Sequence, residues 1–138
     1  MFSMLDVSAS ALNAYRVRMD VIANNVANVE TTRDAQGRSI PYRRRVALFA
    51  QGAAGAAPGQ GVQVSGIVED ASALRKVYDP GHPDAVRTGR DRGYVYYPNV
   101  NPEVEMVDMI VATRAYQANV TAYEAGKSII ASAARLLL

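Results

Sequence analysis

Apolar residues recur at alternating spacings of three and four towards both ends of the chain. The first stripe comprises Leu5, Ser8, Leu12, Tyr15, Met19, Ile22, Val26 and Val29. The second comprises Met106, Met109, Thr113, Tyr116, Val120, Tyr123, Lys127, Ile130, Ala134 and Leu137, with polar breaks at Thr113 and Lys127. This spacing gives each helix one apolar face and suits a coiled-coil-like seam. We predict helices over about residues 4–26 and 102–138, in a chain built around pairing its two ends.

Polar residues mark the inner end of each predicted helix. Asn24, Asn25 and Asn28 are poor in a helix interior because their amides compete for backbone groups, so they predict a turn held by side-chain amides. Asn101 is a good N-cap, and Pro102 suits the first helical position. The second helix is therefore expected to begin at Pro102.

The residues between the helices predict short strands joined by turns. Alternating, β-branched or aromatic segments occur at residues 42–49, 61–70, 74–78 and 93–97. Residues 51–61 are a low-complexity Gly/Ala tract typical of a flexible loop, and 79–83 form a Pro/Gly turn. We predict an α+β fold: residues 1–32 and 99–138 form a helical core domain, and 33–98 a β-rich middle domain.

Composition narrows the function classes. The chain has 138 residues, a net charge of +2 and no cysteine, which excludes disulfides and thiolate chemistry. No apolar run approaches the length of a membrane span, and the first residues lack the pattern of a cleaved signal peptide. Two Phe and no Trp, with abundant Ala, favour close helix packing through small residues. We expect a protein that does not span a membrane, and either stays cytosolic or leaves without signal cleavage.

The candidate chemical residues are few. His82 is the only histidine and lacks companions for a metal or catalytic site. Residues 43–45 are all arginine, but a strand would divide them between two faces, which favours a solvated or salt-bridged surface over phosphate binding. Tyr94, Tyr96 and Tyr97 have no surrounding basic groove and favour packing over base stacking. We expect no enzyme, no catalytic or metal site, no cofactor and no nucleic-acid partner.

Two features favour assembly over an isolated helical hairpin. The helix over residues 5–29 has four charged side chains, and its polar face is mostly Ser, Ala and Asn. The chain also ends in an apolar tip at residues 136–138, and exposed apolar surface commonly marks a partner site. A hairpin that buries its own seam, a cytosolic helical adaptor that oligomerises through its termini, and a nucleic-acid-binding module remain as alternatives.

Several segments resemble the bacterial flagellar rod and hook proteins, and most closely a subunit of the proximal rod. The strongest is DVIANNVANVETT, residues 20–32. The others are residues 41–44, 61–70, 77–84, 97–102 and 105–119. The chain departs from the family pattern in the Gly/Ala tract and at residues 86–92, where basic residues replace a short acidic turn.

This resemblance implies a structural subunit of the flagellar basal body that transmits torque for motility. It implies location in the periplasmic rod, and export through the flagellar type III apparatus without signal cleavage. The implied partners are further copies of the chain, the rod subunits FlgB, FlgF and FlgG, and the FliE adaptor below the rod. The residues expected at the assembly interface are Leu5, Leu12, Met19, Ile22, Asn24, Asn25, Val26, Asn28, Met109, Tyr116, Val120, Tyr123 and Ile130.

Overall fold

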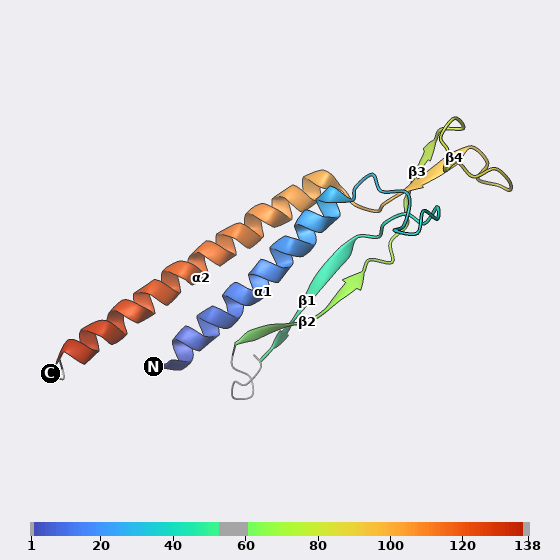
Figure 1. Ribbon diagram of the computed structural model, residues 1–138. Helices are drawn as coiled ribbons and strands as arrows, with labels where there is room; N and C mark the ends of the chain where they lie inside the picture. The colour runs from blue at the N-terminus through green and yellow to red at the C-terminus, as the bar shows by residue number, and fades with distance from the viewer. Residues whose placement is uncertain (1, 53–60, 137–138) are drawn as a thin grey trace.

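The computed structural model describes residues 2–52 and 61–136, as two long helices separated by four short strands (Figure 1). In chain order the elements are α1 (Phe2–Ala27), β1 (Arg45–Gln51), β2 (Val62–Glu69), β3 (Arg75–Tyr78), β4 (Tyr94–Tyr97) and α2 (Pro102–Leu136). The predicted α+β class is confirmed. Most of the Gly/Ala tract (53–60) and the apolar tip at 137–138 lie outside the described residues.

The two helices pack side by side and run antiparallel (Figure 1). α2 begins at Pro102 as predicted, because the side-chain oxygen of Asn101 accepts hydrogen bonds from the backbone N–H groups of Glu103 (2.9 Å) and Val104 (3.3 Å). α2 has 35 residues and α1 has 26, so the C-terminal end of α2 extends past the start of α1. The chain thus pairs its own ends, with the last turns of α2 projecting alone.

The strands form two separate antiparallel pairs. β1 pairs with β2, with a register shift between Leu48 and Phe49, and this ribbon lies along α1 (Figure 1). β3 pairs with β4 in a second ribbon. This ribbon lies past the end of the helix pair at which α1 ends and α2 begins. Residues 42–44, predicted as strand, precede β1 instead. The backbone N–H of Tyr42 bonds to Thr31, and that of Arg44 bonds to Asn99, so neither is available to a sheet.

The apolar core is thin. The buried apolar side chains among the described residues are Ala14, Val21, Ile22, Val95, Pro98, Val100 and Ala112. An isolated two-stranded ribbon is marginal in water, so the β1–β2 ribbon depends on its contact with α1. Neither described helix combines the length and hydrophobicity needed to cross a membrane.

Candidate assembly surfaces and the polar junction

Most of the predicted interface residues lie in the seam between α1 and α2 of the same chain. Ile22 is buried, and the other apolar members are half-buried except Tyr123, which is exposed. The Thr113 hydroxyl lies 3.7 Å from the sulfur of Met19, and Arg18 approaches Asp108 at 3.9 Å across the same seam. The hairpin alternative therefore describes the internal pairing of α1 with α2 correctly.

The seam on α2 follows the predicted stripe only in part: Met109, Thr113 and Tyr116 are half-buried, but other stripe positions are not. Met106, predicted to face inward, is 62% exposed, and Lys127 is exposed as well. The buried positions are instead Glu105, Ala112 and Gly126. A pattern based on large apolar residues does not mark small buried residues such as alanine and glycine. Counting these two residue types as apolar would have marked both positions.

Gly126 shows how closely the helices approach. A Cβ added there would lie 2.6 Å from the terminal methyl carbon of Met4 and 3.1 Å from a methyl carbon of Leu5. Those separations are shorter than ordinary carbon–carbon contact, so glycine permits the present helix spacing at this point. The expectation of close packing through small residues is confirmed here.

The weakly charged face of α1 has a partner within the chain. The Tyr15 ring meets the Phe49 ring of β1 edge-on at 5.5 Å, and the Ser10 hydroxyl accepts a hydrogen bond of 3.1 Å from the backbone N–H of Val62 in β2. The β1–β2 ribbon covers the part of this face around Ser10, whereas Asn13, Ala23, Asn24 and Ala27 remain exposed.

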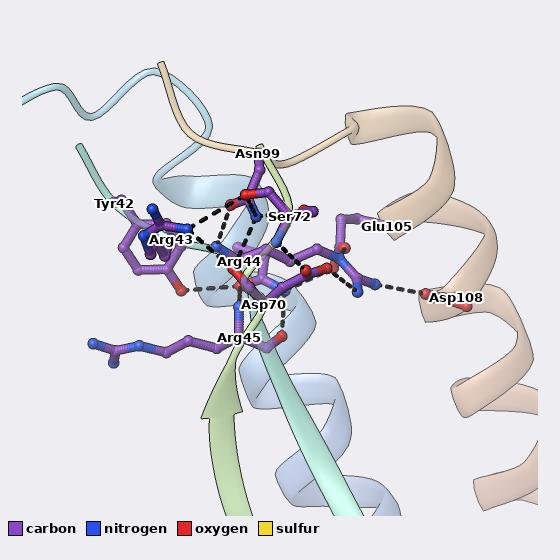
Figure 2. A network of polar contacts seen from close by, with 10 residues as sticks. Tyr42, Arg43, Arg44, Arg45, Asp70, Ser72, Asn99, Glu105 and Asp108 are labelled. Atoms are coloured by element: carbon purple, nitrogen blue, oxygen red, sulfur yellow. Dashed lines mark hydrogen bonds and ion pairs between the residues drawn. The ribbon is translucent and has the colours of Figure 1, made fainter. Parts of the chain in front are cut away.

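A network of polar contacts joins Arg44 to Glu105 near the start of α2 (Figure 2), and a fully hydrogen-bonded asparagine of α1 belongs to it. Asn25 is completely buried, and its amide nitrogen donates to the backbone oxygen of Arg45 (2.8 Å) and to the Glu105 carboxylate (2.9 Å). Its side-chain oxygen accepts from the Tyr42 hydroxyl and the Arg45 backbone N–H, both at 2.9 Å. Both donors and both acceptor sites of this amide are therefore used.

The two neighbouring asparagines act locally instead. Asn24 donates to the backbone oxygen of Asp20 (2.8 Å), and Asn28 donates to that of Asn24 (2.9 Å). The Thr31 hydroxyl then donates to the Asn28 side chain at 3.1 Å. The turn after α1 is held by side-chain amides as predicted, whereas the sequence did not distinguish the role of Asn25.

Arg44 completes this polar junction, which we define as Asn25, Tyr42, Arg44, Asn99 and Glu105. Its guanidinium donates to the buried Glu105 carboxylate at 2.6 Å. Burial tends to lower the pKa of Arg44, but the bond to Glu105 and the surrounding carboxylates outweigh burial and raise it. Glu105 lies in the first turn of α2, where the positive end of the helix dipole favours a carboxylate. It is also part of the junction, where Arg44 neutralises its charge.

The remaining candidate chemical residues have structural contacts. Arg43 donates to backbone oxygens of Asp70 and Ser72, and Arg45 lies 3.8 Å from the Glu69 carboxylate. His82 accepts a hydrogen bond of 3.1 Å at Nδ1 from the Asp84 backbone N–H. Among the described residues, no group of three His, Cys, Asp or Glu side chains could hold a metal ion.

The outer face of α2 carries a second apolar stripe. It comprises eight positions at spacings of three and four: Val104, Val107, Val111, Ala115, Ala118, Ala122, Ala125 and Ile129. All but the half-buried Ala115 are exposed, with Val107 at 59% and Ile129 at 58%. We call this set the outer stripe. A solvated helix face would instead be rich in charged residues.

Comparison with known proteins agrees with this helical organisation. Residues 5–33 match the family described as flagella basal body rod protein, and residues 91–136 match the C-terminal family of the flagellar basal body rod FlgEFG proteins. These matches contain nearly all of α1 and α2, the two elements that form the seam.

Relatives named flagellar basal-body rod protein FlgC match almost the whole chain. The one from Bacillus subtilis (strain 168) is 46% identical over 146 aligned residues, covering 96% of this chain and 95% of the relative. The one from Borreliella burgdorferi is 43% identical, covering 99% and 97%. The one from Escherichia coli O157:H7 is 36% identical, covering 94% and 92%. The chain therefore belongs to the FlgC family of flagellar basal-body rod proteins, a family of structural proteins and not of enzymes.

Proposed function

We propose that the chain is a structural subunit of the proximal rod of the bacterial flagellar basal body, in the axial shaft that transmits torque for motility. The outer stripe of α2 is the observation that carries this proposal. The inner face of α2 is already occupied by α1, so the outer stripe is a second apolar face with no partner among the described residues.

The size and shape of the outer stripe suit packing against a neighbouring helix. Its centre, residues 115–125, is lined by four alanines that allow close approach, and valines and Ile129 flank that centre. Burying the exposed half of each large side chain would contribute about 1 kcal/mol. A single contact of this kind is weak, but repeated contacts that do not close into a ring build a helical array in which each subunit has several neighbours.

The proposed neighbours are further copies of the chain and the rod subunits FlgB, FlgF and FlgG, with the FliE adaptor below the rod. Membership of a rod family supports assembly with rod subunits in general. We assign residues 1–32 and 99–138 to the core domain and 33–98 to a middle domain outside it. During export the flagellar type III apparatus would be a further partner, and the destination would be the periplasmic rod.

Under this proposal the predicted interface residues form two groups, one in contact with neighbouring subunits and one inside the subunit. Asn24 and Tyr123 are exposed, so we assign them to contacts with neighbouring subunits. We assign to the internal seam and junction the other predicted residues, which are Leu5, Leu12, Met19, Ile22, Asn25, Val26, Asn28, Met109, Tyr116, Val120 and Ile130.

A charge placed on the outer stripe tests the proposal. Val111→Glu adds a carboxylate to the stripe at an exposed position, where glutamate favours helix more than valine does, so the isolated fold is retained. Gln117→Glu adds the same charge to another exposed part of α2 and is the matched control. Both genes would replace the native gene in its own bacterium, followed by swimming assays and imaging of basal bodies.

We expect V111E cells not to swim, with basal bodies that stop at the membrane ring or a stub rod, and Q117E cells to swim normally. Complete rods in V111E cells would refute the assembly role of the stripe. Normal motility after deletion of the gene would refute the rod function itself and favour the cytosolic adaptor. Circular dichroism of both purified variants checks that the fold is intact.

A further inference from the structure

A hollow of about 730 Å³ opens at the β3–β4 end of the molecule, between the turn after β3 and the loop before β4. Its walls are Tyr78, Pro80, Gly81, His82, Pro83, Ala85, Val86, Arg87, Arg92 and Gly93. Two guanidinium groups and one imidazole are thus present, and no carboxylate is among the lining residues. Its volume is within the range of ligand pockets in proteins.

Asp84 and Asp91, next to the hollow, are each paired with a cation, whereas the carboxylate of Asp79 accepts a hydrogen bond of 3.1 Å from the Gly81 backbone N–H and forms no ion pair among the described residues. The Asp91 carboxylate accepts hydrogen bonds from Tyr96 and Lys76, and these bonds lower its pKa. Asp84 accepts bonds of 2.8 Å from both Thr32 and Arg33. Within the described part of the chain, the basic residues of the loop form no ion pair. They are Arg87, Arg90 and Arg92.

The walls of the hollow are held in place before any ligand arrives. The Val86 backbone N–H donates to the Tyr94 oxygen and the Gly93 N–H donates to the Val86 oxygen, both at 2.9 Å. The Tyr78 ring lies over Gly93, where an added Cβ would be 2.7 Å from a ring carbon. Binding would therefore involve little ordering of the backbone, which is one of the main costs of association.

We propose that this hollow binds a carboxylate side chain from an acidic peptide segment of a partner protein. Guanidinium groups match the two oxygens of a carboxylate, and the proline, valine and tyrosine walls suit the aliphatic part of such a segment. This inference rests on the local geometry and is independent of the role of the outer stripe.

The neighbouring cations favour a local site over a track for a long polyanion. Lys76 is paired with Asp91, while Arg75 lies over the Tyr97 ring and near Glu30. The basic surface is thus confined to the hollow and the adjoining loop. Nucleic-acid binding requires many phosphate contacts along an extended groove.

Fluorescence anisotropy with the full chain tests the proposal. The probe is a fluorescein-labelled hexaglutamate peptide, with hexaglutamine as the uncharged comparison and a single-stranded oligonucleotide as the phosphate comparison. The test variant is Arg87→Gln with Arg92→Gln. The matched control is Arg16→Gln with Lys127→Gln, which removes the same charge from exposed helix positions.

We expect the wild type and the control to bind hexaglutamate alike, and R87Q/R92Q to bind roughly tenfold more weakly, as expected when two close charge partners are lost. Equal affinity in both variants, no binding by the wild type, equal binding of hexaglutamine, or tighter binding of the oligonucleotide would each overturn the proposal. Thermal melts of the variants establish that a loss of binding is not a loss of fold.

Discussion

Replacing Asn25 by alanine tests whether the polar junction holds the two helices and the β1–β2 ribbon together. The buried amide makes four hydrogen bonds to three different parts of the chain, and alanine would remove all four. The groups left behind include the backbone N–H and oxygen of Arg45 and one oxygen of Glu105. A buried polar group left without its partner costs free energy.

The expected cost follows from these contacts. Each lost hydrogen bond is worth about 1 kcal/mol on average. Alanine returns about 0.6 kcal/mol because it is a better helix former than asparagine. The net loss is therefore about 3 kcal/mol, most of the stability of a marginal domain. In a chain of this length it lowers the melting temperature by roughly 10 °C.

The adjacent Asn24 provides the control. It is exposed, and its side chain donates only to the backbone oxygen of Asp20, four residues earlier in the same helix. Asn24→Ala should change the free energy of unfolding by less than about 0.5 kcal/mol. Thermal and urea unfolding, followed by circular dichroism at 222 nm in dilute solution, would measure both variants. An Asn25→Ala melt within 2 °C of the wild type, or an equal loss in Asn24→Ala, would refute the reasoning.

Two further predictions concern the helix seam and acid stability. Gly126→Ala should leave the free energy of unfolding almost unchanged, because a gain of about 1 kcal/mol in helix propensity offsets the contact with the movable Met4 side chain. Gly126→Leu should lower the free energy of unfolding by at least about 2 kcal/mol, because its larger side chain does not fit between the helices. The same melts would measure both variants, with Ala125→Leu at an exposed position as the control. Burial tends to raise the pKa of Asp84, but bonds from Thr32 and Arg33 outweigh it and lower the pKa below 3.8. Asp84 therefore stabilises the fold above that pH and loses this effect as the pH falls through its folded pKa. Asp84→Asn should flatten the decline in the free energy of unfolding below about pH 4. An unchanged slope would contradict this role of Asp84.

The helices could be predicted from sequence because their signals are local. The Asn101 cap and the proline after it place the start of α2 at the residue observed. The α1 stripe includes Met19, which contacts α2, and Tyr15, which packs against Phe49 of β1. The α2 stripe was displaced by one residue at Met106 and Lys127, because the alanine and glycine that are buried where backbones approach closely count little in a hydrophobic pattern. Met106 was placed inward by its size, although the neighbouring Glu105 is the buried residue.

The polar junction could not be predicted because its partners are distant in sequence. Glu105 and Asn25 are 80 residues apart, and Arg44 and Glu105 are 61 apart. Each residue has a common local explanation: a helix-end amide, a strand arginine, a carboxylate at a helix start. These residues differ from others with the same local role only because three elements of the fold meet where they lie. The segment at residues 20–32 identified the family but not the partner of Asn25.

The distribution of apolar surface links folding to assembly. Few apolar side chains among the described residues are buried, while valine and isoleucine side chains along the outer stripe remain half or more exposed. A buried ion pair such as Arg44 with Glu105 sets the arrangement of elements more than it adds net stability, because desolvation offsets most of the attraction. Much of the stabilisation available to α2 therefore lies on its outer face and is realised only when another helix covers it. We infer that the free chain is marginally stable and that packing of neighbours against the outer stripe supplies the rigidity a torque-bearing subunit needs.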